Sequence, residues 1–168
     1  PGTLASRSFA RAVYGTHPYG FQANAASFNA IGVADMRAFF RRHVAACRAQ
    51  VTLVGAIDRA RAGRIVDQLM AAVQFNDCTA LPEVPAVQPL VRAVDERLPF
   101  AAAQAQVLMG QPGIARDDPD FFPLFVGNYI LGGGGFVSRL TTEVREKRGL
   151  SYSVYSYFVP GLQAGAFQ

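Results

Sequence analysis

Histidines and carboxylates, the residues that most often build a hydrolytic zinc site, are sparse in this sequence. His17 and His43 are the only histidines, they lie far apart along the chain, and the first acidic residue is Asp35. A zinc hydrolase needs three protein ligands and an open position, usually with two histidines close together on one helix. No H-x-x-E-H, H-E-x-x-H or C-x-x-C sequence occurs. The residues therefore predict no metal site made by this chain.

The sequence also lacks the motifs of other kinds of catalytic site. The nucleophile elbow of serine hydrolases, G-x-S-x-G, is missing. The tract Gly132–Gly135 lacks the lysine and the spacing of a phosphate-binding loop, so we interpret Gly132, Gly133, Gly134 and Gly135 as a hinge or a close-packed turn. A further cluster comprises Asp117, Asp118 and Asp120. We interpret these aspartates as residues that satisfy the free amides at a helix start, because acids are favoured there.

One stretch combines elements in an unusual order. Residues 131–158 read L-G-G-G-G-F-V-S-R-L-T-T-E-V-R-E-K-R-G-L-S-Y-S-V-Y-S-Y-F. This pattern predicts the end of an apolar helix, the glycine tract, an amphipathic helix with basic residues in its last turn, and a tyrosine-rich strand. Taken alone, Arg145 would compensate the helix dipole and Tyr152 would pack as a strand aromatic.

The same stretch closely resembles the R/Y motif of the pitrilysin family of inverted zinc metallopeptidases (inverzincins), which includes insulin-degrading enzyme and the mitochondrial processing peptidases. The resemblance lies in S-R-L, V-R-E-K and G-L-x-Y-S, in this order and at these spacings. Two further segments agree: the H-P-Y-G sequence at residues 17–20, and D-M-R-A-F-F at residues 35–40, which leads to V-T-L-V-G. The resemblance therefore covers nearly the whole chain.

The resemblance implies roles for two residues. Arg145 and Tyr152 would reach across an interdomain cleft to a peptide substrate that lies on the zinc ion. A guanidinium and a phenol are both hydrogen-bond donors, and donors aimed at the scissile carbonyl stabilise the oxyanion of peptide hydrolysis. The zinc ligands of the family, H-x-x-E-H and a distal glutamate, match no residue of this chain, so zinc would be bound by the full-length protein or by a partner subunit.

The resemblance also implies the function. We expect part of a zinc metalloendopeptidase that supplies substrate-binding residues and is inactive alone. The alternative is a non-catalytic partner subunit or scaffold, similar to processing-peptidase or bc1 core subunits. An upstream H-x-x-E-H would favour the first. Expected partners are a peptide or protein substrate, the zinc-binding half or a homologous subunit, and, if two chains exchange halves, a second copy.

Prolines suggest how the chain is organised. Pro82, Pro85, Pro89 and Pro99 interrupt a segment that has no sustained period. With the resemblance, this predicts the second half of a first peptidase-like domain over residues 1–75, a linker over 76–98, and the first half of a second domain over 99–168. The expected fold class is α+β, with an antiparallel or mixed sheet and helices packed on one face.

Hydrophobic periodicity predicts the individual elements. Helices are expected over residues 33–44, 60–73 and 120–131 and from about residue 136, and strands over 50–55, 105–110 and 151–158. The helix at 120–131 is apolar on nearly every face, so it should be buried. Asp58 should cap its helix, Gly149 should end another, and Arg139 should pair with Glu143. In the helix from residue 136, the inward residues should be Val137, Leu140, Thr141 and Val144.

Composition sets the remaining limits. Of 168 residues, 51% are hydrophobic and 17% charged, which is typical of a globular protein. The longest apolar run, residues 121–131, is too short to cross a bilayer. Despite a net charge of +4, the arginines of the predicted 33–44 helix fall opposite its apolar stripe on a face without aromatics, so we do not expect nucleic-acid binding. Cys47 and Cys78 are expected to be separate buried thiols, and a disulfide between them is the alternative. The compartment stays open, with bacterial periplasm and cytoplasm both compatible.

Overall fold

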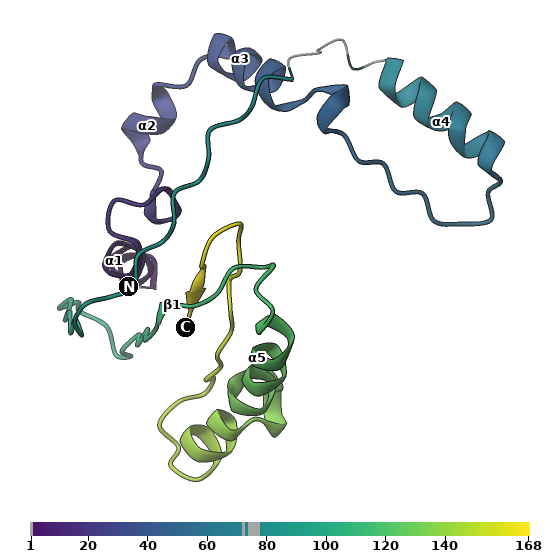
Figure 1. Cartoon of the computed structure of the whole chain (residues 1–168). Helices are drawn as coiled ribbons and strands as arrows, with labels where there is room; N and C mark the ends of the chain where they lie inside the picture. The colour runs from purple at the N-terminus through teal and green to yellow at the C-terminus, as the bar shows by residue number, and fades with distance from the viewer. Residues whose placement is uncertain (1, 72, 74–77) are drawn as a thin grey trace. The chain divides into compact units, whose positions relative to one another are not determined.

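The chain packs into two units (Figure 1). The computed structural model describes residues 2–71, 73 and 78–168. Unit 1 contains the N-terminal residues to Gln22 together with Val84–Gln168, and unit 2 contains Ala23–Glu83. The predicted domain boundary at residues 75 and 76 lies outside the described residues, and the division by homology into 1–75, 76–98 and 99–168 stays a prediction.

Unit 1 joins the N-terminal helix to the C-terminal half of the chain. Its elements are α1 (Gly2–Tyr14), the 3-10 turns η1 (Pro18–Gly20) and η4 (Gly135–Val137), the helix α5 (Phe121–Asn128), the π-helical segments η3 (Tyr129–Gly133) and η5 (Thr141–Glu146), and the strands β1 (Gln111–Pro112) and β2 (Ala166–Phe167). The predicted helix at 120–131 is confirmed, except that it changes from α to π winding after Asn128.

The sheet of unit 1 is small and antiparallel. Gln111 of β1 is opposite Phe167 of β2, and Pro112 is opposite Ala166. Phe158 adds an isolated bridge to Phe167. The α+β class with an antiparallel sheet is confirmed. The predicted strand over 105–110 is wrong, since none of these residues is in a strand, and the one over 151–158 is wrong in extent. Of the latter, Phe158 forms the bridge and Tyr157 exchanges backbone hydrogen bonds with Gln168 at 2.8 and 3.0 Å, whereas a ladder needs a run of paired neighbours.

Tyr14 of α1 and Tyr19 of the H-P-Y-G segment both bind the C-terminal residues of unit 1. The Tyr14 hydroxyl accepts from the Ala166 amide at 2.7 Å, and the Tyr19 hydroxyl accepts from the Gln163 amide at 3.1 Å. Burial raises the pKa of Tyr14. His17 uses both ring nitrogens: Nδ1 accepts from the Tyr19 amide at 3.1 Å, and Nε2 lies 2.8 Å from the Pro85 carbonyl oxygen. These contacts give the segment a structural role within unit 1.

Unit 2 is helical. Its elements are α2 (Ala25–Asn29), α3 (Val33–His43), the 3-10 turn η2 (Ala46–Arg48) and α4 (Arg59–Ala71). The predicted helices over 33–44 and 60–73 are confirmed to within two residues. Asp58 caps α4 as predicted, since its Oδ1 accepts from the Arg61 amide at 2.7 Å. The predicted strand over residues 50–55 is wrong, because this segment has no ladder partner among the described residues.

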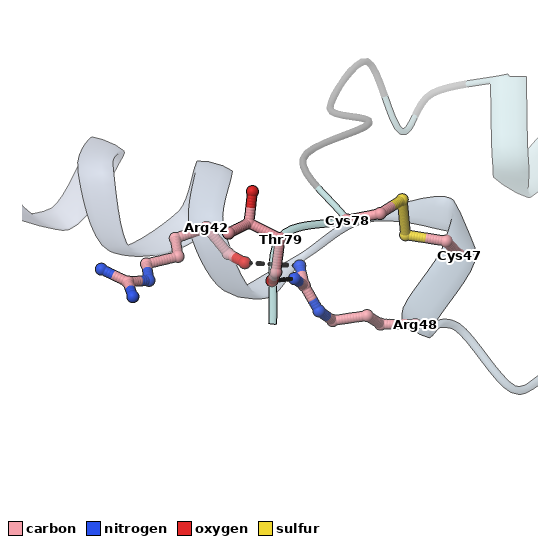
Figure 2. The surroundings of a disulfide bond; sticks show 5 residues. All are labelled: Arg42, Cys47, Arg48, Cys78 and Thr79. Atoms are coloured by element: carbon pink, nitrogen blue, oxygen red, sulfur yellow. Dashed lines mark hydrogen bonds between the residues drawn. A yellow bond between two sulfur atoms is a disulfide. The ribbon is translucent and has the colours of Figure 1, made fainter. Parts of the chain in front are cut away.

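A disulfide closes the chain around α4 (Figure 2). Cys47 and Cys78 are bonded, with their Cα atoms 6.2 Å apart. Beside the bond, the Arg48 guanidinium donates to the carbonyl oxygens of Arg42, at 2.7 Å, and of Thr79. The expectation of separate buried thiols is wrong: both cysteines are exposed, and the fold brings them together across 31 residues.

Large apolar faces stay exposed in both units. In unit 2, Phe39 of α3 is 64% exposed. In unit 1, α5 exposes Phe122, Phe125 and Val126. The prediction that residues 120–131 are buried is wrong for this chain, because few of its side chains have neighbours to pack against.

Candidate functional site

The glycine tract carries the chain from one helical segment to the next: Gly132 and Gly133 are the last residues of η3, and Gly134 leads into η4. The Gly134 amide donates to the Tyr129 carbonyl at 2.8 Å, and Gly135 has a φ of +60°, the left-handed conformation expected somewhere in the tract. A Cβ on Gly132 would lie 2.5 Å from the Ser156 amide nitrogen. On Gly133 it would lie 2.7 Å from the side chain of Asn128. The tract is therefore closely packed, and motion about it stays a prediction.

A buried hydroxyl network fixes the turn to the next helix. Ser138 Oγ donates to Thr141 Oγ1 at 3.0 Å and accepts from the Thr141 amide at 3.3 Å. Thr141 Oγ1 in turn donates to the Gly135 carbonyl at 2.9 Å. The helix thus begins after Ser138 rather than near Phe136, because Ser138 accepts from the first free amides. Thr141 is buried as predicted, but Val137 is exposed, since η4 turns it away from the helix.

The charged face of this helix is neutralised without Arg145. Glu143 accepts from Lys147 at 2.6 Å and from Arg148 at 3.1 Å, and these bonds lower the pKa of Glu143. The predicted pair of Arg139 with Glu143 is wrong, because the Glu143 carboxylate is bound to Lys147 and Arg148 on its other side. Among the residues that the structure describes, no carboxylate pairs with Arg145.

Gly149, the predicted stop, closes the turn that follows the last residue of the helix, Glu146. Its φ is +61°, its amide donates to the Arg145 carbonyl at 3.0 Å, and the Leu150 amide donates to the Val144 carbonyl at 3.1 Å. Paired bonds of this kind around a left-handed glycine satisfy the last carbonyls of a helix. The chain then reverses, which brings Tyr152 back beside the turn that carries Arg145.

Arg145 and Tyr152, the two residues predicted to act together, lie together. The guanidinium carbon of Arg145 is 5.1 Å from the centre of the Tyr152 ring. It is also 4.9 Å from the centre of the Phe136 ring. Tyr152 is 87% exposed, so its hydroxyl can reach a ligand in solvent. Sequence reasoning missed Phe136; the available signal was an aromatic directly after the glycine tract.

The described residues do not fit a metal site. In the ranges 2–71, 73 and 78–168, no three histidine, cysteine, aspartate or glutamate residues are placed to hold an ion. Asp118, near the start of α5, instead accepts from the Asp120 amide at 2.9 Å. No helix within the same ranges is long and apolar enough to cross a membrane.

Comparison with known proteins decides the family. The model of the peptidase M16 inactive domain matches residues 30–168. This chain belongs to that family. An M16 relative, an uncharacterized zinc protease of Streptomyces coelicolor, is 36% identical over 99% of this chain and 38% of its own length. Another, the uncharacterized zinc protease YmxG of Bacillus subtilis, is 44% identical over 32% of this chain and 13% of its own length.

A crystal structure supports the M16 assignment. The peptidase M16 inactive domain from Pseudomonas fluorescens superposes with a TM-score of 0.90 at 40% identity, over 99% of this chain and 40% of that chain. The expected membership in a zinc metallopeptidase family and the fold are thereby confirmed. This M16 chain spans about 40% of the length of these relatives.

Proposed function

We propose that this M16 chain supplies substrate-binding and transition-state-stabilising donors for peptide-bond hydrolysis by a zinc metalloendopeptidase. The observation that carries the proposal is the Arg145 guanidinium, which lies over the exposed Tyr152 ring and has no carboxylate partner among the described residues. An arginine already paired with a carboxylate would have its donors occupied. The N–H donors of Arg145 are available to a substrate.

The chemistry of the two groups suits one task. The guanidinium keeps its charge at every physiological pH and offers several N–H donors, and the phenol offers one O–H donor. When a peptide carbonyl is attacked, negative charge develops on its oxygen, and donors already positioned there lower the barrier. Because no three histidine, cysteine, aspartate or glutamate residues among those described are placed to bind an ion, the chain would act with a zinc-binding catalytic half or a homologous subunit and would be inactive alone. A dimer of this chain is a further arrangement to test.

The second candidate is a non-catalytic subunit or scaffold. The description of the matching family as an inactive domain favours it. It differs from the first candidate in what accompanies the chain: a zinc-binding H-x-x-E-H region in the same protein supports the peptidase, and its absence supports the scaffold.

Replacing Tyr152 tests the proposed donor role. We expect Tyr152→Phe, in the complete native protein, to lower kcat for a fluorogenic peptide by about 10- to 100-fold, since it removes one hydrogen bond to a developing charge. Tyr155→Phe is the matched control, because Tyr155 is an exposed tyrosine of the same segment that stacks on Tyr157 instead. Equal kcat values for the two variants would contradict the role of Tyr152.

We also propose that the protein works in an oxidising compartment such as the bacterial periplasm. The support is the Cys47–Cys78 disulfide, since cytosolic thiols are usually kept reduced. Fractionation of native cells should place the protein outside the cytoplasm, with both thiols protected from alkylation until a reductant is added. Recovery from the cytoplasm with two alkylated cysteines would refute this.

A further inference from the structure

We propose that Phe136 is a positioning residue that holds the Arg145 guanidinium in the orientation in which it meets the substrate. This inference rests on the proposed function of Arg145. It adds a third residue to the pair, at a position to which no role was predicted, and it explains why a large aromatic side chain is left in solvent beside the glycine tract.

The Arg145 guanidinium contacts two aromatic rings. Its carbon lies 4.9 Å from the centre of the Phe136 ring and 5.1 Å from that of the Tyr152 ring, both within the range of a cation–π interaction. Between Phe136 and Tyr152 themselves, both of which are described, the structure has no ring contact. Arg145 therefore links the two aromatics, and each ring limits where its planar group can lie.

The backbone that carries Phe136 is fixed to the helix that carries Arg145. Phe136 follows Gly135, whose carbonyl accepts from both the Ser138 amide at 3.1 Å and Thr141 Oγ1 at 2.9 Å. Ser138 is 1% exposed, so this anchor is among the most deeply buried parts of unit 1. Because its backbone is fixed in this way, the Phe136 ring can restrict the position of the flexible Arg145 side chain.

Phe136 itself contributes little burial. It is 72% exposed, and Arg145 is the one ring or cation partner that the structure gives it among the described residues. A free arginine side chain samples many rotamers, and restricting them before substrate binds lowers the entropy cost of forming the transition state. Phe136 therefore orients Arg145 rather than stabilising unit 1.

Three variants of the complete native protein separate this role from simple packing. Phe136→Leu keeps an apolar side chain but removes the π face, and we expect kcat to fall about five-fold with KM nearly unchanged. Phe136→Trp keeps a π face and should restore kcat to within two-fold of the wild type. Phe122→Leu is the matched control, because Phe122 is equally exposed but touches Phe121 instead of an arginine; its kcat should not change.

A double-mutant cycle supplies the decisive readout. If Phe136 acts through Arg145, Phe136→Leu should have no further effect in the Arg145→Ala background. The inference is overturned if Phe136→Leu leaves kcat unchanged, or if its effect persists in full without Arg145. A different result would contradict the proposed function itself: the single variant Arg145→Ala would then leave kcat unchanged.

Discussion

Arg145→Ala is expected to lower kcat for peptide hydrolysis by the complete native protein about 100- to 1,000-fold, the loss typical of an oxyanion donor. The effect should exceed that of Tyr152→Phe, because the guanidinium contributes a fixed charge as well as hydrogen bonds. Arg145→Lys keeps the charge but loses the planar fork, so its kcat should lie between those of the wild type and Arg145→Ala. Steady-state kinetics with a fluorogenic peptide measures all three.

Arg139→Ala is the matched control for Arg145→Ala. Arg139 lies six residues earlier, at the start of the same helix, is exposed, and among the described residues forms no cation–π contact with Phe136 or Tyr152. Its removal should leave kcat within two-fold of the wild type. If Arg145→Ala hydrolyses the peptide as fast as Arg139→Ala while retaining its fold by circular dichroism, the chain does not stabilise the transition state through Arg145.

Loss of the Cys47–Cys78 disulfide should have the largest effect on stability. The bond closes a loop across 31 residues, and the chain-entropy relation predicts that opening it lowers the free energy of unfolding of unit 2 by about 3 to 4 kcal/mol. Cys47→Ser should therefore speed hydrogen exchange of the amides of α4, measured by mass spectrometry. The amides of α5, in unit 1, should exchange as in the wild type.

A reductant provides the control for the disulfide. Adding it to the wild type should reproduce the exchange of Cys47→Ser, whereas it should change nothing in the variant. Protection of α4 that survives both the substitution and the reductant would show that the hydrogen bonds of Arg48 and the cap at Asp58 suffice to hold unit 2 without the covalent link.

Local signals in the sequence were reliable where neighbours along the chain determine the structure. The apolar spacing of α3 and α4, the cap at Asp58 and the stop at Gly149 all depend on residues within one or two turns. Strands failed for the opposite reason: residues 50–55 have the composition of a strand, but a ladder also needs a partner from elsewhere in the chain.

The candidate site was predictable only in part. Periodicity and composition gave Arg145 and Tyr152 no special role, and their selection came from the resemblance to a family. The pairing of Glu143 was mispredicted because three basic residues, Arg139, Lys147 and Arg148, lie within reach of it along the chain, and spacing alone does not choose between them. The contact of Phe136 with Arg145 joins residues nine positions apart, one in the 3-10 turn η4 and the other in the π-helical segment η5, and no helical or strand period describes it.

The exposed apolar faces of α3 and α5 bear on how a cell would treat this chain alone. Side chains such as Phe39 and Phe122 are the kind of surface that chaperones and quality-control proteases recognise. A chain that kept these faces open would be removed faster than it accumulated. The abundance of the M16 chain in cells would then follow the supply of whatever covers these faces, so that unpaired copies do not persist.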